Sequence, residues 1–147
     1  MNYNFRSGYE NMDFDKVSGM LTNAYWCKGI CKPEVMKGAG NSSLVVGVFS
    51  PENEQIGYAR VISDKTRFAY ILDVIIDDRF RRQGIGQHLM MYILQHEDLK
   101  EVYQFLLRTS DAHGVYSKVG FQPVSRPADW MEIRHSRPER KGHGKNS

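Results

Sequence analysis

The chain has 147 residues and a mass of 17.0 kDa, a size at which one domain can bury a continuous core without disulfides or a structural metal. Its composition, 41% hydrophobic, 25% charged and 12% aromatic, excludes wholesale disorder. No apolar run approaches the roughly 18 residues that a membrane-spanning helix needs, and residues 1–10 lack the apolar centre of a signal peptide. We therefore expect a soluble, cytoplasmic protein with no membrane partner. The two cysteines, Cys27 and Cys31, are too few for a disulfide framework or a four-ligand zinc set, and we expect no metal.

The formal net charge of +3 at pH 7 is unevenly distributed along the chain. Five of the 20 lysines and arginines lie after residue 133, together with one of the 17 acidic residues. Residues 1–133 therefore carry 15 basic and 16 acidic side chains and are nearly neutral. We expect a folded domain over residues 1–133 and a basic, disordered tail over residues 134–147. The tail alone would suit a nucleic-acid-binding protein, but the neutral domain predicts no nucleic-acid partner.

The first third of the chain predicts one short strand and two helices. Residues 3–5 have strand character, and Asp13 is expected to cap a helix over residues 14–24, where apolar residues recur at helical spacing. Pro33 suits the first turn of a second short helix, which we expect to end near Gly40.

Three β segments are expected next, over residues 44–49, 56–62 and 68–76. The polar turn at residues 50–54 joins the first two segments and predicts a hairpin. Residues 68–76 form the most hydrophobic β segment of the chain, so we expect a central strand that is buried on both faces.

The second half of the chain alternates between helices and β segments. The expected elements are a helix over residues 85–96, a strand over 102–109, a helix over 112–119 and a last β segment between Phe121 and Ile133. Ser110 or Asp111 is expected to cap the helix at 112–119, and Gly120 to end it.

A basic glycine loop separates the hydrophobic strand from the helix that follows it. Gly84 and Gly86 let the backbone approach a ligand closely, the free N–H groups of a helix N-terminus bind anions, and Arg81 and Arg82 attract a multiply charged group. A diphosphate is therefore the expected ligand, and the alternative is a tight turn in which the glycines serve only geometry. The P-loop motif fails, because Gln87 and His88 stand where it needs Lys and then Ser or Thr. The dinucleotide motif fails because Leu89 replaces its third glycine.

These residues resemble the GCN5-related N-acetyltransferases, the GNAT superfamily. The family's acyl-CoA loop reads Gln or Arg, two variable residues, Gly, one variable residue, then Gly or Ala, and Arg81, Gly84 and Gly86 fit it. A second family motif places an alanine, a tyrosine four residues later and a Gly-Phe pair around a short helix. The residues at those positions are Ala112, Tyr116, Gly120 and Phe121. The resemblance covers about residues 44–121.

The resemblance implies a fold and an activity. The implied fold is of the α/β (α+β) class: a single GNAT-like domain with a central mixed, mostly antiparallel twisted sheet that is flanked by helices and splayed at the acyl-CoA site. The implied activity is that of an acetyl-CoA-dependent N-acetyltransferase, which moves an acetyl group directly to an amine of a small molecule or peptide in a ternary complex. The resemblance leaves open whether the protein forms a homodimer. The alternative is a non-catalytic acyl-CoA-binding or interaction module with the same fold.

The resemblance also implies roles for individual residues. The strand backbone at Val74, Ile75 and Ile76 would pair with the pantetheine arm of acetyl-CoA. Thr109, which stands where the family often has an asparagine, and Ala112 would also contact the cofactor, and Tyr116 would protonate the departing CoA thiolate. The loop that would hold the pyrophosphate consists of Arg81, Arg82, Gln83, Gly84, Ile85, Gly86 and Gln87.

An amine with a pKa near 10.4 must lose a proton before it can attack a thioester at pH 7, so the reaction needs a base. Asp73 is the candidate, since it is the only charge inside the most apolar strand. A purely structural role, in which Asp73 accepts hydrogen bonds from neighbouring loops, remains open. Tyr58 and His113 are alternative bases. The aromatic residues Tyr25 and Trp26 either pack in the core or flank the acyl site.

Overall fold

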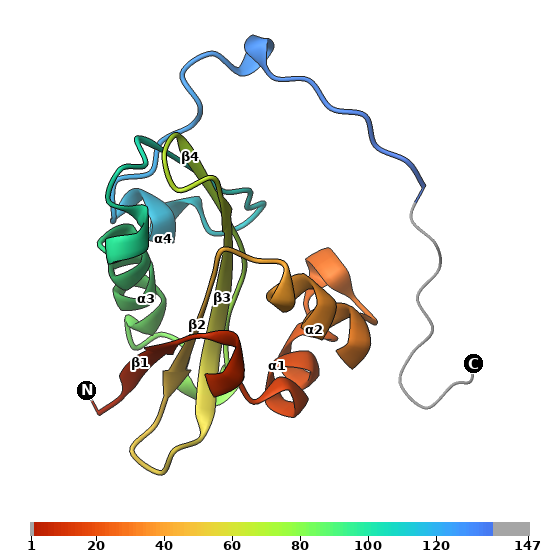
Figure 1. Cartoon of the computed structure of the whole chain (residues 1–147), viewed down its shortest axis with the longest axis vertical. Coiled ribbons are helices and arrows are strands. Elements are labelled where there is room, and N and C mark those ends of the chain that lie inside the picture. The colour runs from red at the N-terminus through yellow and green to blue at the C-terminus, as the bar shows by residue number, and fades with distance from the viewer. Residues whose placement is uncertain (1, 137–147) are drawn as a thin grey trace.

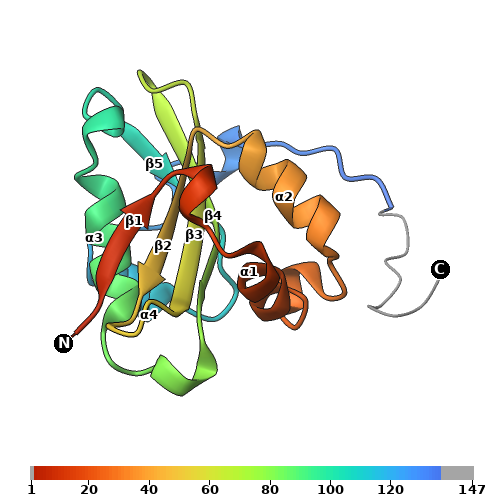
Figure 2. The same ribbon diagram turned by 60° about the horizontal axis from the view of Figure 1, so that its bottom comes forward.

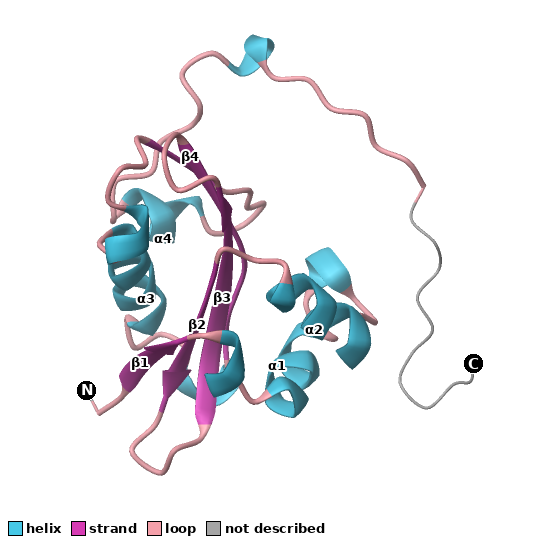
Figure 3. Ribbon diagram, viewed as in Figure 1, coloured by secondary structure: helices cyan, strands magenta, loops and turns pink. Residues whose placement is uncertain are grey.

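The computed structural model describes residues 2–136, in which a five-stranded mixed sheet lies between two layers of helices. The strands are β1 (Asn4–Ser7), β2 (Leu44–Phe49), β3 (Gln55–Ser63), β4 (Phe68–Ile76) and β5 (Gln104–Leu106), and they are ordered β1-β2-β3-β4-β5. The first four strands pair antiparallel, whereas β4 and β5 are parallel. Helices α1 (Phe14–Leu21) and α2 (Lys32–Gly40) cover one face of the sheet, and α3 (Ile85–Leu94) and α4 (His113–Ser117) cover the other (Figures 1, 2 and 3). Short 3₁₀ turns lie at Tyr9–Asn11, Tyr25–Cys27, Asp78–Phe80, Glu97–Leu99 and Pro127–Asp129.

Each helical layer closes its own apolar core against the sheet. On the α3 side, Val46 and Val48 of β2 pack with Leu89 and Ile93, all fully buried. On the α1 and α2 side, Val45 of β2 belongs to a second cluster with buried residues of both helices. Alternate residues of β2 thus enter opposite cores, as the period of two in a strand requires. The sheet is buried on both faces.

Strand β4 contains one extra residue relative to β3. Tyr58 pairs with Ile75 and Arg60 pairs with Leu72, so Asp73 and Val74 together lie opposite a single residue of β3. Asp73 has φ 58°, the left-handed conformation that an aspartate adopts more readily than most side chains. The bulge also reverses which face of the sheet the following residues occupy. Ile71 therefore packs in the core under α3 while Ile75, four residues on, packs in the core under α1.

Close packing near the start of β3 requires a glycine at position 57. A Cβ atom at this position would lie 2.9 Å from Ile76 Cδ1 and 3.0 Å from Val48 Cγ2. We expect Gly57→Ala to lower the free energy of unfolding by about 1–3 kcal/mol, because both neighbours belong to packed strands and must shift. Urea unfolding followed by circular dichroism measures the change. The control is Gly19→Ala on the exposed side of α1, where a Cβ meets no atom within 4 Å and helix propensity should raise stability slightly. Equal stabilities for both variants would contradict the packing argument.

The observed elements match the predicted ones closely in the first half of the chain. The strands at 44–49 and 68–76 have the predicted bounds, and the Asp13 side chain accepts a hydrogen bond from the Lys16 N–H (3.2 Å), which confirms the cap of α1. None of the helices within residues 2–136 is long and apolar enough to cross a membrane.

Three predictions for the second half need correction. The strand predicted over 102–109 is shorter, Gln104–Leu106, because its pairing with β4 stops where the two strands diverge. The helix predicted over 112–119 is the five-residue α4, which begins after Ala112 and has no side-chain cap, so neither Ser110 nor Asp111 caps it. In the turn before it, Thr109 Oγ1 accepts a hydrogen bond from the Ala112 N–H at 3.0 Å. The β segment predicted between Phe121 and Ile133 forms no strand. Of the tail predicted over residues 134–147, residues 137–147 lie outside the described part of the chain.

Candidate active site

The parallel strands β4 and β5 stay together over only three residue pairs. Pairing runs from Phe68 with Gln104 to Tyr70 with Leu106, after which β4 continues alone to Ile76. Within residues 2–136, the backbone at 74–76 has no strand partner on the β5 side, although Ile75 and Ile76 still pair with β3 on the other side. Such an edge presents N–H and C=O groups to any extended ligand that carries amides. The predicted splay of the sheet is confirmed.

A helix N-terminus lies just beyond the end of this open edge. Gly84, at φ 78°, is the N-cap of α3, and the first helical hydrogen bond runs from the His88 N–H to the Gly84 carbonyl (3.2 Å). The N–H groups of residues 85–87 therefore have no partner inside the helix and, together with the helix dipole, attract an anion. A Cβ at Gly86 would meet no protein atom within 4 Å, so open space lies beside this turn. The motif-based prediction of a loop that opens a helix is confirmed.

The two arginines of the loop differ in their surroundings. Arg81 Nε donates to the Ile76 carbonyl at 3.1 Å, and its Nη2 pairs with Asp78 at 3.0 Å. Arg82 has φ 65° and is exposed. A strand-end carbonyl and an exposed acid thus hold one cation at the loop, while the other extends into solvent.

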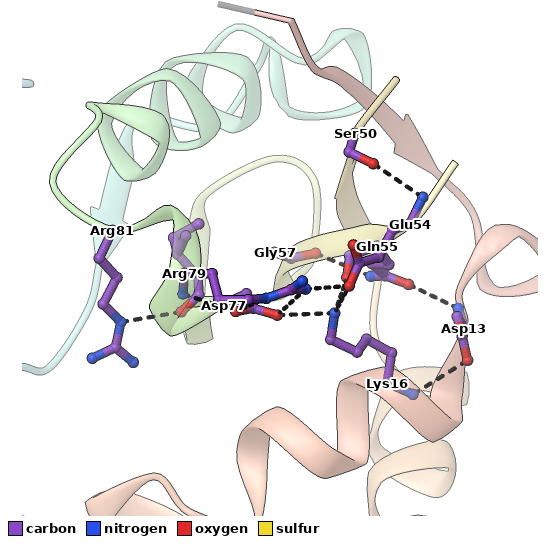
Figure 4. A network of polar contacts seen from close by, with 10 residues as sticks. Asp13, Lys16, Ser50, Glu54, Gln55, Gly57, Asp77, Arg79 and Arg81 are labelled. Atoms are coloured by element: carbon purple, nitrogen blue, oxygen red, sulfur yellow. Dashed lines mark hydrogen bonds and ion pairs between the residues drawn. The ribbon is translucent and has the colours of Figure 1, made fainter. Parts of the chain in front are cut away.

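A polar network fixes the point at which β4 passes into the loop (Figure 4). The Asp77 carboxylate contacts Lys16 Nζ (2.9 Å) and Arg79 Nη2 (3.0 Å), and both cations also contact Glu54. The Asp77 N–H donates to the Ile56 carbonyl at 2.8 Å. Side chains from α1, from the β2–β3 turn and from the loop are joined in this way, so the glycine loop begins from a fixed position.

The network predicts that the folded protein loses stability at acidic pH. Hydrogen bonds from Arg79 hold the pKa of Asp77 well below its ordinary value of 3.8, and Lys16 and Arg79 lower the pKa of Glu54. A carboxylate whose pKa is depressed by folding stabilises the protein above its unfolded pKa, and this contribution is lost as pH falls. We expect the melting temperature to drop as pH decreases below about 4. In Asp77→Asn, measured by calorimetry between pH 7 and pH 2.5, the drop should be shallower; an identical pH dependence would exclude Asp77 as its source.

Tyr116 lies on α4, in the helical layer that covers the same face of the sheet as α3. It is half-buried, its ring meets Phe121 edge-on at a centroid distance of 6.1 Å, and it packs against the core under α3. Burial raises the pKa of Tyr116 above its ordinary value of 10.0. The phenol therefore stays protonated at neutral pH, the state that a proton donor requires.

Two aromatic residues bridge the open edge, and we call Tyr25 and Trp26 the aromatic bridge. The Trp26 indole N–H donates to Asp73 Oδ1 at 2.9 Å, while the Tyr25 hydroxyl accepts from Ser110 Oγ at 2.8 Å. The two rings are perpendicular, with centroids 5.1 Å apart. The bridge thus connects the bulge of β4 with the loop that follows β5. Of the two sequence-based interpretations, core packing does not apply to Tyr25, which is 56% exposed.

Asp73 is held on both carboxylate oxygens. Oδ2 accepts from Arg60 Nε at 2.7 Å, opposite the Trp26 bond to Oδ1. Arg60 Nη1 in turn contacts the Gly38 carbonyl and Ser42 Oγ, both at 3.4 Å. The positive φ of the bulge directs the Asp73 side chain toward α2, beside the open edge.

A groove of about 280 Å³ lies between α2 and the sheet, next to Asp73. It is lined by Ile30, Glu34, Val35, Lys37, Gly38, Asn41, Arg60, Ile62 and Asp73. Gly38 leaves room for the Arg60 guanidinium, since a Cβ there would lie 3.3 Å from its Cζ. The groove therefore combines an apolar wall with charges of both signs and opens beside the bulge.

The remaining sequence candidates lie in different environments. Tyr58 is fully buried, its hydroxyl has no hydrogen-bond partner within residues 2–136, and burial raises its pKa well above 10, so it is a poor base at neutral pH. His113 is the exposed first residue of α4. Thr109 is occupied by the turn that starts α4. In the described residues, no group of three or more His, Cys, Asp or Glu side chains could hold a metal ion.

A mixed sheet whose parallel strands separate beside a glycine turn and a helix N-terminus is the arrangement expected from the resemblance to the GNAT acetyltransferases. The chain belongs to the GNAT acetyltransferases: the model of the acetyltransferase (GNAT) domain matches residues 42–123, more than half of its length.

Two curated relatives are named as uncharacterized N-acetyltransferases. The protein from Gracilaria tenuistipitata var. liui is 37% identical over 71 residues, which are 44% of this chain and 39% of that protein. The protein from Pyropia yezoensis is 25% identical over 121 residues, covering 80% of this chain and 69% of that protein. This chain thus spans only part of the length of these relatives.

Solved structures share the fold over nearly the whole chain. A putative GNAT acetyltransferase from Xanthomonas campestris pv. campestris superposes with a TM-score of 0.83 at 32% identity, covering 92% of this chain and 94% of that one. A predicted acetyltransferase from Clostridium acetobutylicum, solved with acetyl-CoA, has a TM-score of 0.67 at 17% identity and covers 90% of this chain and 96% of that one, a likeness of fold alone.

Proposed function

We propose that this protein transfers the acetyl group of acetyl-CoA to an amine of a small molecule or peptide, by direct attack in a ternary complex. The observation that carries the proposal is the open edge of β4, which leads directly to the N-terminus of α3. An extended chain with amides and a diphosphate at one end has the two features that these elements bind. Pantetheine joined to a pyrophosphate is such a ligand.

In this proposal the backbone at 74–76 pairs with the amides of pantetheine as an additional strand would. The N–H groups of residues 85–87 bind the pyrophosphate, aided by the positive charge of Arg81 and Arg82. The thioester then lies near the bulge, between Asp73 and Tyr116. Gln83, Gly84, Thr109 and Ala112 shape the backbone on the two sides of the cofactor.

The amine enters from the groove under α2. The ammonium first gives one proton to the base. The neutral nitrogen then forms a bond to the thioester carbonyl carbon, the carbon–sulfur bond breaks, a second proton passes from the nitrogen to water, and the thiolate of CoA takes up a proton from a donor that water reprotonates. Tyr116 donates that proton, since burial keeps its phenol protonated and a thiolate in a closed site is a stronger base than in water. Asp73 Oδ1, which already accepts an N–H from Trp26, is the oxygen that receives the amine proton once the acceptor replaces the indole.

The test combines binding with turnover in the full-length protein. Calorimetric titration with acetyl-CoA measures binding, and release of the free CoA thiol is followed with a panel of alkyl amines, amino acids and peptides. We expect binding and turnover of at least one class of amine. Tight binding without turnover on any class would favour the non-catalytic acyl-CoA-binding module, and absence of binding would overturn both readings.

The role of Asp73 as base predicts a loss of turnover without a loss of cofactor binding. Asn suits the left-handed backbone at residue 73 and can still accept the Trp26 N–H, but it cannot take a proton. We expect Asp73→Asn to lower kcat by about 10²-fold or more while the dissociation constant of acetyl-CoA stays within a factor of about two. A kcat close to that of the parent protein would remove Asp73 from the mechanism. Circular dichroism of the variant checks that the bulge survives.

A further inference from the structure

The groove between α2 and strands β3 and β4 combines an aliphatic wall with an ion pair (Figures 1 and 2). Ile30 and Val35, which are 7% and 4% exposed, form the wall together with Ile62, which lies on the same face of β3 as Arg60. The volume of about 280 Å³ lies just below the range of about 300–1,000 Å³ that is typical of pockets for drug-sized ligands. The groove therefore has room for one molecule of about the size of an amino acid.

The ion pair of the groove joins β3 to the bulge of β4. Arg60 Nε lies 2.7 Å from Asp73 Oδ2, and the two side chains are only 19% and 10% exposed. A pair with so little exposure loses hydration that its mutual attraction only partly returns, so fold stability is a weak reason for its presence. Its place in a groove beside the open edge of β4 indicates a role in binding.

Each partner of the ion pair retains a group for a ligand. Arg60 Nη1 contacts the Gly38 carbonyl and Ser42 Oγ, both at 3.4 Å, whereas Nη2 makes no hydrogen bond within residues 2–136. Nη2 shares an edge of the planar guanidinium with Nε, so its donors lie beside the contact with Asp73. Asp73 Oδ1 accepts the N–H of Trp26, a residue that is 38% exposed and that an incoming amine can displace. A cationic donor and a carboxylate acceptor are thus adjacent.

The charges that line the groove balance one another. Lys37 and Arg60 carry two positive charges, and Glu34 and Asp73 carry two negative ones. A polyamine or a phosphorylated amine would bring an excess of one sign into this neutral site, whereas a zwitterion brings none. In an α-amino acid the ammonium and the carboxylate stand on one carbon atom, so both can reach an ion pair whose own atoms are 2.7 Å apart.

We propose that the acceptor is a free α-amino acid with an apolar side chain. This inference rests on the proposed acetyl transfer and narrows its amine to one class. The carboxylate binds Arg60 Nη2, the amine replaces the Trp26 N–H on Asp73 Oδ1, and the side chain packs on the three aliphatic residues of the wall. The N-terminus of a peptide does not meet these requirements, because a neutral amide stands where the amino acid has its carboxylate.

Acceptor binding can be measured without chemistry, by calorimetric titration of the full-length protein in the presence of excess CoA. The probes are L-leucine, 3-methylbutylamine, which is leucine without its carboxylate, and glycine, which lacks the apolar side chain. We expect L-leucine to bind at least about 10-fold more tightly than either of the other two, because a hydrogen bond to a charged group and a buried aliphatic side chain each supply that much. Equal or tighter binding of 3-methylbutylamine would overturn the carboxylate site, and equal binding of glycine would overturn the role of the wall.

Arg60→Lys tests the residue that is proposed to bind the carboxylate. Lysine keeps a positive charge beside Asp73 but lacks the planar fork of arginine. The ratio of the dissociation constants of 3-methylbutylamine and L-leucine is compared within each variant, so general damage to the site cancels. We expect this ratio to fall by at least about 10-fold. An unchanged ratio would overturn the role of Arg60.

Lys32→Gln is the matched control. Lys32 is also a cation of α2, but its ammonium pairs with exposed Asp15 at 2.6 Å and it does not line the groove. The ratio of the two dissociation constants should stay at the parent value in this variant. A fall equal to that in Arg60→Lys would mean that any cation of this region produces the selectivity, and the assignment to Arg60 would fail.

Turnover distinguishes this proposal from the proposed function on which it rests. Release of the CoA thiol from acetyl-CoA in the presence of L-leucine would support both. Binding of L-leucine without turnover of any amine would support the amino-acid site and overturn acetyl transfer. Turnover of other amines without binding of L-leucine would overturn the amino-acid acceptor and leave acetyl transfer in place.

Discussion

Tyr116→Phe is expected to lower kcat for acetyl transfer by about 10²-fold while the dissociation constant of acetyl-CoA stays within a factor of about two. No hydrogen bond joins the Tyr116 hydroxyl to another residue of the described chain, and its ring packs edge-on against Phe121. Phenylalanine therefore preserves the packing and removes only the proton donor. Steady-state kinetics with the best amine acceptor and calorimetric titration with acetyl-CoA separate the two effects.

The control for this variant is Tyr92→Phe. Tyr92 on α3 is also half-buried and packs against Phe5 with a ring centroid distance of 5.0 Å. It packs against the core under α3 and has no role in the proposed mechanism. Removal of the Tyr92 hydroxyl should leave kcat unchanged. If Tyr116→Phe retains the parent kcat as well, Tyr116 has no part in the chemistry, and its position on α4 serves packing alone.

Gly86→Leu is expected to weaken acetyl-CoA binding by about 100-fold, which corresponds to about 2.7 kcal/mol. A side chain at Gly86 meets no protein atom within 4 Å, so it would project into the space that the pyrophosphate needs. The fold should not suffer, because leucine has a higher helix propensity than glycine by up to about 1 kcal/mol. Titration calorimetry measures the affinity, and thermal unfolding measures the stability.

Gly19→Leu provides the comparison for this substitution. Gly19 lies on the exposed side of α1, where a new side chain also has open space, and it is not part of the loop before α3. It should bind acetyl-CoA like the parent protein. Equal affinity in both variants would mean that the space beside Gly86 is not the anion site, and the assignment of the loop would fail.

The strands of the first half could be predicted because their signals are local. Residues 44–49 and 68–76 are short apolar runs bounded by polar turns. Each of these strands pairs with β3, its neighbour along the chain, so the pairing needs no distant partner. The position of the glycine loop could likewise be predicted, since strand, loop and helix are contiguous in the sequence. The length of β5 could not be predicted, because it depends on where β4 diverges from β5.

The geometry around Asp73 could not be predicted from the sequence. A lone charge in an apolar strand identifies Asp73 as unusual. The extra residue of the bulge, however, appears only when β4 is paired with β3, and the hydrogen-bond donors to the Asp73 carboxylate come from other elements. Trp26 is 47 residues from Asp73, and Tyr25 is 85 residues from Ser110. Contacts at such separations leave no periodicity, so the aromatic bridge had no signal beyond two adjacent aromatic residues.

The segment after α4 illustrates a third limit. The sequence predicts a β segment between Phe121 and Ile133, but a strand forms only beside a partner strand, and within the described residues no strand pairs with this segment. The partner that a strand needs is not encoded in the segment itself, so the local sequence predicted a strand that the fold does not form.

Amide hydrogen exchange of the full-length protein, with and without saturating acetyl-CoA, tests the central claim most directly. If the open edge of β4 and the N-terminus of α3 bind the cofactor, exchange should slow by at least about tenfold, a differential protection of about 1.4 kcal/mol, at residues 74–76 and 85–87. The amides of β1 and β2 should be less affected, since they lie away from the open edge. Unchanged exchange at both 74–76 and 85–87 in the presence of saturating acetyl-CoA would contradict the account.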